Sequence, residues 1–256
     1  MKSETALQVV KLINELRKDP KSFAANVKTR LDTFDGFNYF DSEGVGYRSI
    51  EGKSACQEAY DYLLNAKPTN ELIYSEGLSR CSESHCDDLS RSGEVSHVGS
   101  DGCSMGKRID KFGSWAGKVG EVISVMAGTP MEIMLQWIVC DGVKGRGDRL
   151  TLLSGDFTKF GVSFNSNHKE YETCTVAVFA GVFGEEGDQN GPSPVHNANL
   201  LDEMPQEFKK LPDGAKGMTV SRKTMIENGQ YKVIYIFRYD MADGTQKEVT
   251  KEVIQK

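Results

Sequence analysis

The sequence predicts an α/β fold, a three-layer α/β/α sandwich with a C-terminal antiparallel β-meander extension. First, apolar residues recur at helical spacing in several stretches before residue 140. Second, two strand-like runs follow them, and one of these runs is apolar on both faces, as is typical of a central strand covered by helices. Third, turn dipeptides separate three alternating runs beyond residue 215.

The first two helices are predicted on either side of a proline. Apolar residues at helical spacing form the face of the first helix, namely Ala6, Val9, Val10, Ile13 and Leu16. This helix ends before Pro20, where Asp19 and Pro20 supply the N-cap and the first turn of a second helix. Residues 32–53 then lose the periodicity and are predicted to form a long surface loop.

Further helices are predicted from their capping signals. Ser54 and Gln57 form a capping box for a third helix, which ends before Pro68. A fourth helix covers residues 76–91, and a short helical piece covers 105–112. Within the fourth helix, Cys81 and His85 are four residues apart and suitable to share a metal, but no second ligand pair follows, so we expect them in the core.

A capping box also predicts the last helix before the strands. Thr129 is its N-cap, Pro130 its first residue, and Glu132 completes the box. Its apolar stripe consists of Ile133, Met134, Trp137 and Ile138. An extended stretch at 117–126 precedes it, and strands are predicted at 159–166 and 171–183.

The chain is predicted to divide at a composition break rich in Gly, Pro, Asn and acids. We expect a domain over residues 1–183, a linker over 184–197 and a small β-rich extension over 198–256. The extension has turns at Asn228-Gly229 and Asp243-Gly244. One face of its middle strand carries Val233, Tyr235, Phe237 and Tyr239. We expect this face to pack on the first domain or on another protein.

Composition limits the partners and the compartment. The chain has 31 Lys and Arg against 37 Asp and Glu, with no basic run, so we expect no nucleic-acid partner. No apolar stretch is long enough for a signal-peptide core or a transmembrane segment, so a cytoplasmic location is expected, with secretion by a route without a signal peptide as the alternative. The six cysteines form no CxxC motif and are expected to be mostly free thiols.

Four motifs carry a family resemblance: "INELRKDPKSF", "SHVGSDG", "GEVISV" and "CDGVKGRGDRLTLLSGDFTKFGVSF". In order and spacing they resemble the CAP superfamily of cysteine-rich secretory proteins, antigen 5 and pathogenesis-related proteins, in the style of bacterial and protist SCP domains. The resemblance implies a sandwich whose cleft often holds two histidines and two acids. His97 matches the first histidine and Glu121 the first acid. The second acid falls where Cys140 and Asp141 stand, and the second histidine falls at Asp148.

These positions define a candidate cleft for ligand binding. The glycines of "GVKGRGDR" allow the turn to fold back, so that Asp148 faces the cleft with His97 and Glu121. Asp141 and Arg146 complete the candidate set, and Arg146 and Arg149 are expected to pair with the acids. The alternative is that the charged turn only clamps the helix to the sheet.

The chemistry of the cleft is predicted from its donors. His97, Glu121 and Asp148 are the candidate metal ligands, and a single histidine favours Mg, Ca or Mn over Zn. Three possible nucleophiles, Ser96, Ser100 and Cys140, stand in no recognisable motif. We therefore assign no catalytic residue and expect that the protein is not an enzyme.

The function expected is that of a non-catalytic CAP-domain binding or scaffold protein. It would dock protein partners through the C-terminal extension in a larger assembly, for example a cytoskeletal or ciliary one. One alternative is a sterol- or lipid-binding protein in which the aromatic residues of the 32–53 loop, Phe34, Phe37, Tyr39 and Phe40, wall an apolar groove. The other is a metal-dependent hydrolase with a degenerate His/Glu/Asp cleft.

Overall fold

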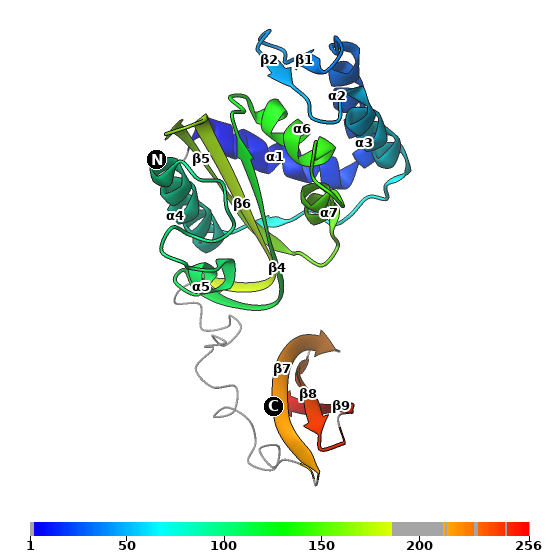
Figure 1. Ribbon diagram of the computed structural model, residues 1–256, viewed down its shortest axis with the longest axis vertical. Helices are drawn as coiled ribbons and strands as arrows, with labels where there is room; N and C mark the ends of the chain where they lie inside the picture. Colours follow the sequence, from blue (N-terminus) through cyan, green and yellow to red (C-terminus); the bar gives the residue numbers. More distant parts are fainter. Residues whose placement is uncertain (1–2, 186–211, 213, 228–229, 244, 256) are drawn as a thin grey trace.

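The computed structural model describes residues 3–185, 212, 214–227, 230–243 and 245–255 (Figure 1). Its helices are α1 (Glu4–Lys18), α2 (Pro20–Asp32), α3 (Lys53–Asn65), α4 (Glu76–Ser92), α5 (Met105–Ile109), α6 (Pro130–Val139) and α7 (Gly147–Leu153). Its strands are β1 (Asn38–Phe40), β2 (Gly46–Arg48), β3 (Ile73–Tyr74), β4 (Gly113–Val125), β5 (Lys159–His168), β6 (Glu172–Glu185), β7 (Ala215–Glu227), β8 (Gln230–Met241) and β9 (Gln246–Gln255). None of the described helices combines the length and the apolar character that a membrane span needs.

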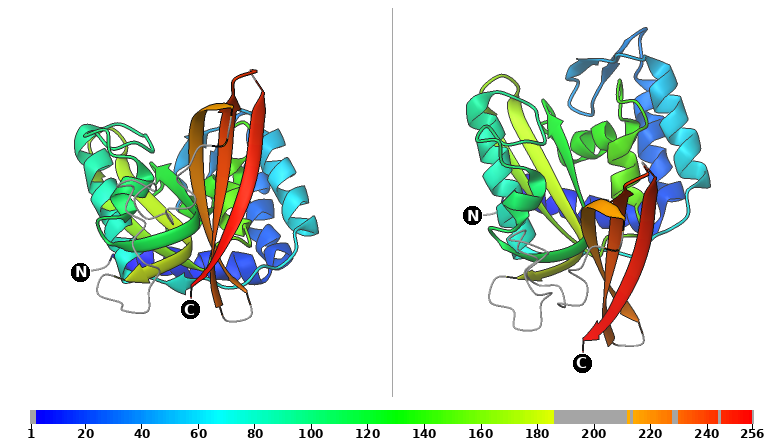
Figure 2. Two further views of the ribbon diagram at one scale, coloured as in Figure 1. Left: turned by 90° about the horizontal axis from the view of Figure 1, so that it is seen from below. Right: turned by 60° about the horizontal axis from the view of Figure 1, so that its bottom comes forward.

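A central sheet with helices on both faces confirms the predicted three layers. The strand order is β3-β5-β6-β4, with β3 parallel to β5 and the other neighbours antiparallel. Helix α4 covers one face of β5 and β6, while α1, α6 and α7 cover the other face of the sheet, and α2 and α3 pack outside them (Figures 1 and 2).

The central strand β6 explains why two cores form. Its alternate residues point to opposite faces of the sheet. Ala177 and Phe179 enter the core shared with α1, α2, α3 and α6, whereas Val176 and Val178 enter the core shared with α4. All four are fully buried, so a strand that is apolar on both faces joins the two helical layers, as predicted.

Three capping predictions have different outcomes. The Asp19 side chain accepts a hydrogen bond from the Ser22 amide at 2.9 Å, which confirms the N-cap of α2. Thr129 caps α6 in the same way, but the side chain of Glu132 turns into the core and does not close the box. The predicted box of Ser54 and Gln57 is wrong. Helix α3 starts two residues earlier, with Gly52 at φ 68° as its N-cap, and Ser54 donates to the carbonyl of Glu51.

Two regions of the first domain contain more structure than predicted. The loop at 32–53 includes a short antiparallel hairpin, β1–β2, in which the rings of Tyr39 and Tyr47 stack with centroids 5.3 Å apart. The glycine-rich turn after α6 leads directly into helix α7, which the sequence analysis did not expect. Both are short elements bounded by glycines, whose composition resembles that of a loop.

The C-terminal extension is a three-stranded antiparallel meander, as predicted. Strand β6 continues to Glu185, so it takes the first two residues of the predicted linker, whose remainder lies outside the described residues. On the predicted aromatic face, Phe237 and Tyr239 are buried and their rings stack with centroids 6.0 Å apart. The side chains of Val233 and Tyr235 also lie outside the described residues. Strand β7 contacts β4 of the first domain.

Most of the cysteines, and the Cys81–His85 pair, are buried in the core. All six cysteines are free, and all except Cys103 are buried. Cys81 and His85 are both buried on the sheet-facing side of α4. His85 has a further role at the candidate site.

Candidate functional site

Glu121 is the centre of the candidate cleft, and both of its carboxylate oxygens are engaged. Strand β4 places its side chain in the protein, where only 1% of it is exposed. Oε1 lies 2.9 Å from Nδ1 of His97, and Oε2 accepts a hydrogen bond of 2.6 Å from Nη2 of Arg108. The hydrogen bond to Glu121 raises the pKa of His97. The structure thus brings together His97 and Glu121, as predicted, and adds Arg108 as a second partner of Glu121.

Arg108 was not predicted as a site residue. It lies on the short helix α5, is almost fully buried, and also approaches the carbonyl oxygens of Cys103 and His97 at 3.4 and 3.5 Å. No motif in the sequence indicated this role, because its partner Glu121 lies on a separate strand.

His85 supports the same cluster from α4. Its Nε2 lies 2.8 Å from the carbonyl oxygen of Ser96 and 3.7 Å from Oε1 of Glu121. Burial lowers the pKa of this imidazole, so the neutral ring donates its Nε2 proton to Ser96. This hydrogen bond holds the backbone next to His97 against α4. His85 is therefore a core residue that positions the site.

Asp148 is the acid that remains without a partner. It lies in the first turn of α7, is half-buried, and its carboxylate has no hydrogen-bond partner among the described residues. Burial raises its pKa to about 6, and the nearby positive charge of His97 acts in the opposite direction. His97 and Asp148 therefore lie close enough for their charges to interact.

Asp141 and Arg146 belong to a different group of charges. The carboxylate of Asp141 accepts hydrogen bonds from the backbone amides of Ile50 and Glu51 at 2.6 and 2.9 Å. The guanidinium of Arg146 contacts Glu51 at 2.5 Å and Glu58 at 2.9 Å. These two residues therefore fasten the turn after α6 to the start of α3.

Arg149 completes this group. It is 1% exposed, and its Nη2 contacts Glu58 at 2.7 Å. We call the group the clamp; its members are Glu51, Glu58, Asp141, Arg146 and Arg149. The expectation that Arg146 and Arg149 pair with the cleft acids is wrong, because their partners lie on and before α3. The alternative interpretation of a salt-bridged turn describes them better, with α3 rather than the sheet as the clamped element.

Left-handed backbone makes this turn possible. Cys140 and Arg146 have φ values of 50° and 55°, and Gly142 and Gly145 have 74° and 83°. A Cβ at Gly142 would lie 2.6 Å from Cδ1 of Ile50, so only glycine fits that position without movement. The glycines therefore bring the turn close to the loop before α3.

The three proposed metal ligands do not fit a further cation as they are arranged. Glu121 already contacts the guanidinium of Arg108 and the imidazole of His97, so a divalent ion would have to displace both. Among the described residues, no group of three or more His, Cys, Asp and Glu side chains is placed to hold a metal ion. The guanidinium of Arg108 supplies the positive charge that balances the buried carboxylate of Glu121.

Beside the cleft lies a cavity of about 420 Å³, between the β1–β2 hairpin, the end of β4 and α6. Aromatic side chains form much of its wall, namely Phe34, Tyr39, Tyr47 and Trp137. Two of the predicted loop aromatics, Phe34 and Tyr39, therefore line it, whereas Phe37 and Phe40 are about half exposed. Asp141 and Asp148 also line it.

Exposed apolar residues surround the opening of this cavity. Ile50, Met126 and Val143 line it and are 73%, 54% and 43% exposed. Such residues are costly to leave in water when they gather around one opening. We call these three residues the apolar rim.

Comparison with known proteins finds one matching family model and similar solved structures. The family model described as CAP, cysteine-rich secretory protein family, matches residues 10–183. One similar solved structure is an outer surface protein from Borrelia burgdorferi, with 14% identity, a TM-score of 0.38, and coverage of 46% of this chain and 80% of that chain. Another is an extracellular protein containing a SCP domain from Bacillus anthracis, with 19% identity, a TM-score of 0.36, and coverage of 48% and 39%. A search of curated proteins returned no match.

Proposed function

The chain belongs to the cysteine-rich secretory protein (CAP) family, and from its cleft we propose that it is a non-catalytic binding protein that receives an apolar segment of a protein partner. The observation that carries this proposal is the aromatic cavity of about 420 Å³, which opens through the apolar rim. Aromatic walls with a few polar groups are typical of sites that bind apolar ligands.

The state of the candidate nucleophiles supports a non-catalytic role. Ser100 donates to Asp88 of α4 at 2.5 Å, and the Ser96 hydroxyl accepts from the Val98 amide at 3.0 Å, so both hydroxyls hold the loop in place. Cys140 is buried, and burial raises the pKa of its thiol to about 11. A thiol with this pKa is protonated at neutral pH and is a poor nucleophile. None of the three is paired with His97 as a nucleophile is paired with a base.

The locked carboxylate supports the same proposal and argues against a metal. Both oxygens of Glu121 already have a partner, so a substrate proton or a metal ion would have to compete with Arg108 and His97 for this carboxylate. We therefore propose that the cluster fixes the loop of His97 at the edge of the binding surface. Calorimetry with Zn, Mg, Ca and Mn should show no binding that is lost in His97→Ala.

The C-terminal extension is proposed as a second contact for protein partners. Its aromatic residues Phe237 and Tyr239 are buried, so the meander has a packed face. A three-stranded meander needs a hydrophobic face against another element for stability. Its contact through β7 with β4 ties it to the CAP domain.

Fluorescence of Trp137 offers a direct test of the cavity. The chain has two tryptophans, so Trp115→Phe leaves Trp137 as the single reporter in the cavity wall. A short peptide of alternating phenylalanine and leucine should change its emission with saturation. Met126→Asp in the rim should weaken this binding about tenfold, whereas Val95→Asp, equally exposed but away from the cavity, should not.

A sterol titration distinguishes the lipid alternative. If cholesterol hemisuccinate changes the emission of Trp137 and the peptide does not, the protein is a sterol binder and the partner proposal is wrong. If neither ligand binds, the cavity has no role in binding.

A further inference from the structure

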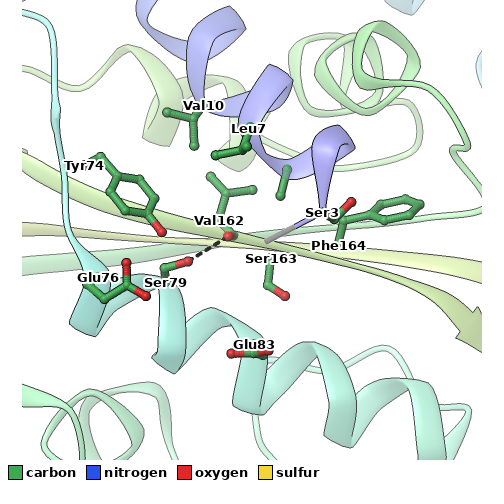
Figure 3. Close-up of a pocket in the computed structure, with 11 residues that line it drawn as sticks. Ser3, Leu7, Val10, Tyr74, Glu76, Ser79, Glu83, Val162, Ser163 and Phe164 are labelled. Atoms are coloured by element: carbon green, nitrogen blue, oxygen red, sulfur yellow. Dashed lines mark hydrogen bonds between the residues drawn. The ribbon is translucent and has the colours of Figure 1, made fainter. Parts of the chain in front are cut away.

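A second cavity, of about 420 Å³, lies at the other edge of the sheet, between α1 and α4. Figure 3 shows α1 on one side, α4 on the other and strand β5 along the floor. The sheet order is β3-β5-β6-β4, so this groove and the cleft cavity at β4 lie at opposite edges. The groove therefore belongs to neither the cleft cluster nor the clamp.

The floor of the groove is an open strand edge. Strand β3 pairs with β5 only at Lys159 and Phe160, after which the chain leaves the sheet to enter α4. From Gly161 to the end of β5, no described strand lies on that side. An unpaired strand edge presents a row of amides and carbonyls that can pair with another strand.

The hydrogen bonds of β3 show which backbone groups face the groove. The amides of Ile73 and Ser75 donate to the carbonyls of Thr158 and Phe160, at 2.8 Å each. Because every second residue of a strand turns its backbone to the same edge, Val162 and Phe164 face the groove as well. The hydroxyl of Ser79 donates a hydrogen bond of 3.0 Å to the carbonyl of Val162, as Figure 3 shows. The amide of Val162 and both backbone groups of Phe164 remain for a ligand.

The two walls differ in chemistry. On the α1 side, Leu7 and Val10 line the groove, and Leu7 is 45% exposed. On the α4 side, Glu83 points toward it and has no ion-pair or hydrogen-bond partner among the described residues. Alternate side chains of a strand between these walls would face apolar surface and a carboxylate in turn.

We propose that this groove binds an extended peptide segment of a protein partner, which adds a strand to β5. The segment alternates apolar residues, which face Leu7 and Val10, with lysine or arginine, which face Glu83. Strand addition of this kind takes affinity from backbone hydrogen bonds and specificity from alternate side chains.

The occupant is a single strand and not a second copy of this sheet. Helices α1 and α4 flank the open edge on both faces, so the β5 edge of another copy, flanked in the same way, would bring four helices together before the strands could pair (Figure 1). The carboxylate of Glu83 favours a basic segment, in keeping with the net charge of −6.

Fluorescence polarisation with the full-length protein tests the proposal. The probe is a short fluorescein-labelled peptide of alternating valine and lysine, and the comparison peptide alternates valine and glutamate. The lysine peptide should bind with an affinity that falls with salt, and the glutamate peptide should not bind. Glu83→Lys should weaken binding by at least about fivefold, whereas the exposed Glu94→Lys, in the loop just after α4, should leave it unchanged.

Backbone methylation separates strand addition from charge attraction alone. Two lysine–valine peptides are N-methylated at alternate positions, so that one loses the amides that face β5 and the other loses those that face away. The peptide without the amides that face β5 should lose about tenfold in affinity or more, and the other peptide should keep its affinity. Equal affinity for both methylated peptides, or no binding at millimolar peptide, would overturn the proposal. So would binding of a labelled fatty acid that displaces the peptide and ignores Glu83→Lys. Trp137 and Met126 report on the other edge of the sheet, so failure here leaves the cleft proposal standing.

Discussion

Two charged clusters meet in the turn after α6, where Asp148 stands between Arg146 and Arg149, and they use their charges differently. In the clamp every member has a partner, and these partners fasten α7 to α3. In the cleft cluster, made of His85, His97, Arg108, Glu121 and Asp148, the side chain of His97 is 62% exposed and Asp148 has no hydrogen-bond partner among the described residues. Paired charges hold elements of the fold together, whereas the exposed imidazole of His97 and the unpaired carboxylate of Asp148 are able to meet a ligand.

Burial sets the strength of each cluster. The side chain of Glu121 is 1% exposed, whereas that of Glu58 in the clamp is 47% exposed. Ion pairs in a buried environment interact strongly but become costly when one partner is lost, whereas exposed pairs contribute little. The two clusters should therefore respond very differently to the same substitution.

The largest effect is expected from Glu121→Ala. This substitution leaves the guanidinium of Arg108 buried without its carboxylate, which should cost about 3–5 kcal/mol of unfolding free energy. Urea denaturation of the full chain measures it. The matched control is Glu51→Ala in the clamp, which should cost at most about 1 kcal/mol because its partner Arg146 is 20% exposed and keeps Glu58. Equal losses for the two variants would show that burial does not separate the clusters.

A smaller loss is expected from Arg149→Ala in the clamp. Arg149 is 1% exposed, and its guanidinium lies over the ring of Tyr62 at 4.6 Å. The variant loses this stacking and the pair with Glu58, which should cost about 2 kcal/mol. Arg149→Lys should recover only part of the loss, because an ammonium cannot reproduce the planar contacts. Full recovery in the lysine variant would contradict the stacked geometry.

The sequence predicted the fold from local signals that tertiary structure did not override. The N-caps Asp19 and Thr129 satisfy amides within their own helices, so their hydrogen bonds depend on nearby residues only. Strand β6 could be predicted because both of its faces are apolar. The hairpin β1–β2 and helix α7 were missed because they are held by distant residues, as in the contacts of Tyr39 with Glu132 and of Arg149 with Glu58.

The site was predicted in part for the same reason. The resemblance placed His97 and Glu121 together, and the structure does so at 2.9 Å. Arg108 joins them from α5 and His85 from α4, and no spacing in the sequence predicts these contacts. Asp141 was placed in the cleft because the resemblance puts the second acid there, and Arg146 because it lies in the same turn, but each finds its partner before or on α3.

Asp148→Asn should sharpen the comparison through pH. The pKa of Asp148 is raised from 3.8 to about 6, so the folded protein binds more protons than the unfolded chain between these values. Stability from this group is therefore lost as pH rises from about 4 to about 6, and Asp148→Asn should recover about 1–2 kcal/mol at neutral pH. Unfolding free energies measured across this range provide the test. The exposed Asp156→Asn should leave the dependence of unfolding free energy on pH unchanged over this range, because the pKa of Asp156 is lowered and the group titrates below it.

His97 acts in a higher pH range. Its pKa is raised by Glu121, so its contribution is fully present below about pH 6.5 and is lost as pH rises through the raised value. That loss should remain in Asp148→Asn and disappear in His97→Ala. An Asp148→Asn variant as unstable as the wild type at neutral pH would mean that the acid has a partner that compensates its burial.

The smallest effect is expected from Arg146→Ala, at the solvent side of the clamp. The side chain of Arg146 is 20% exposed and its two partners are more exposed, so the pairs are screened by water and should contribute about 0.5–1 kcal/mol. The hydrogen bond from Arg146 lowers the pKa of Glu51 from 4.5 to about 2, with a second contribution from the amide of Gly142. NMR titration of Glu51 should therefore show a rise toward 4.5 that stops short of it, because the amide of Gly142 still donates. Lys118→Ala, which breaks an exposed pair with Asp156, should leave the titration of Glu51 unchanged. An unfolding loss above about 2 kcal/mol would mean that the clamp behaves as a buried cluster, and the distinction between the two groups of charges would then rest on Asp148 alone.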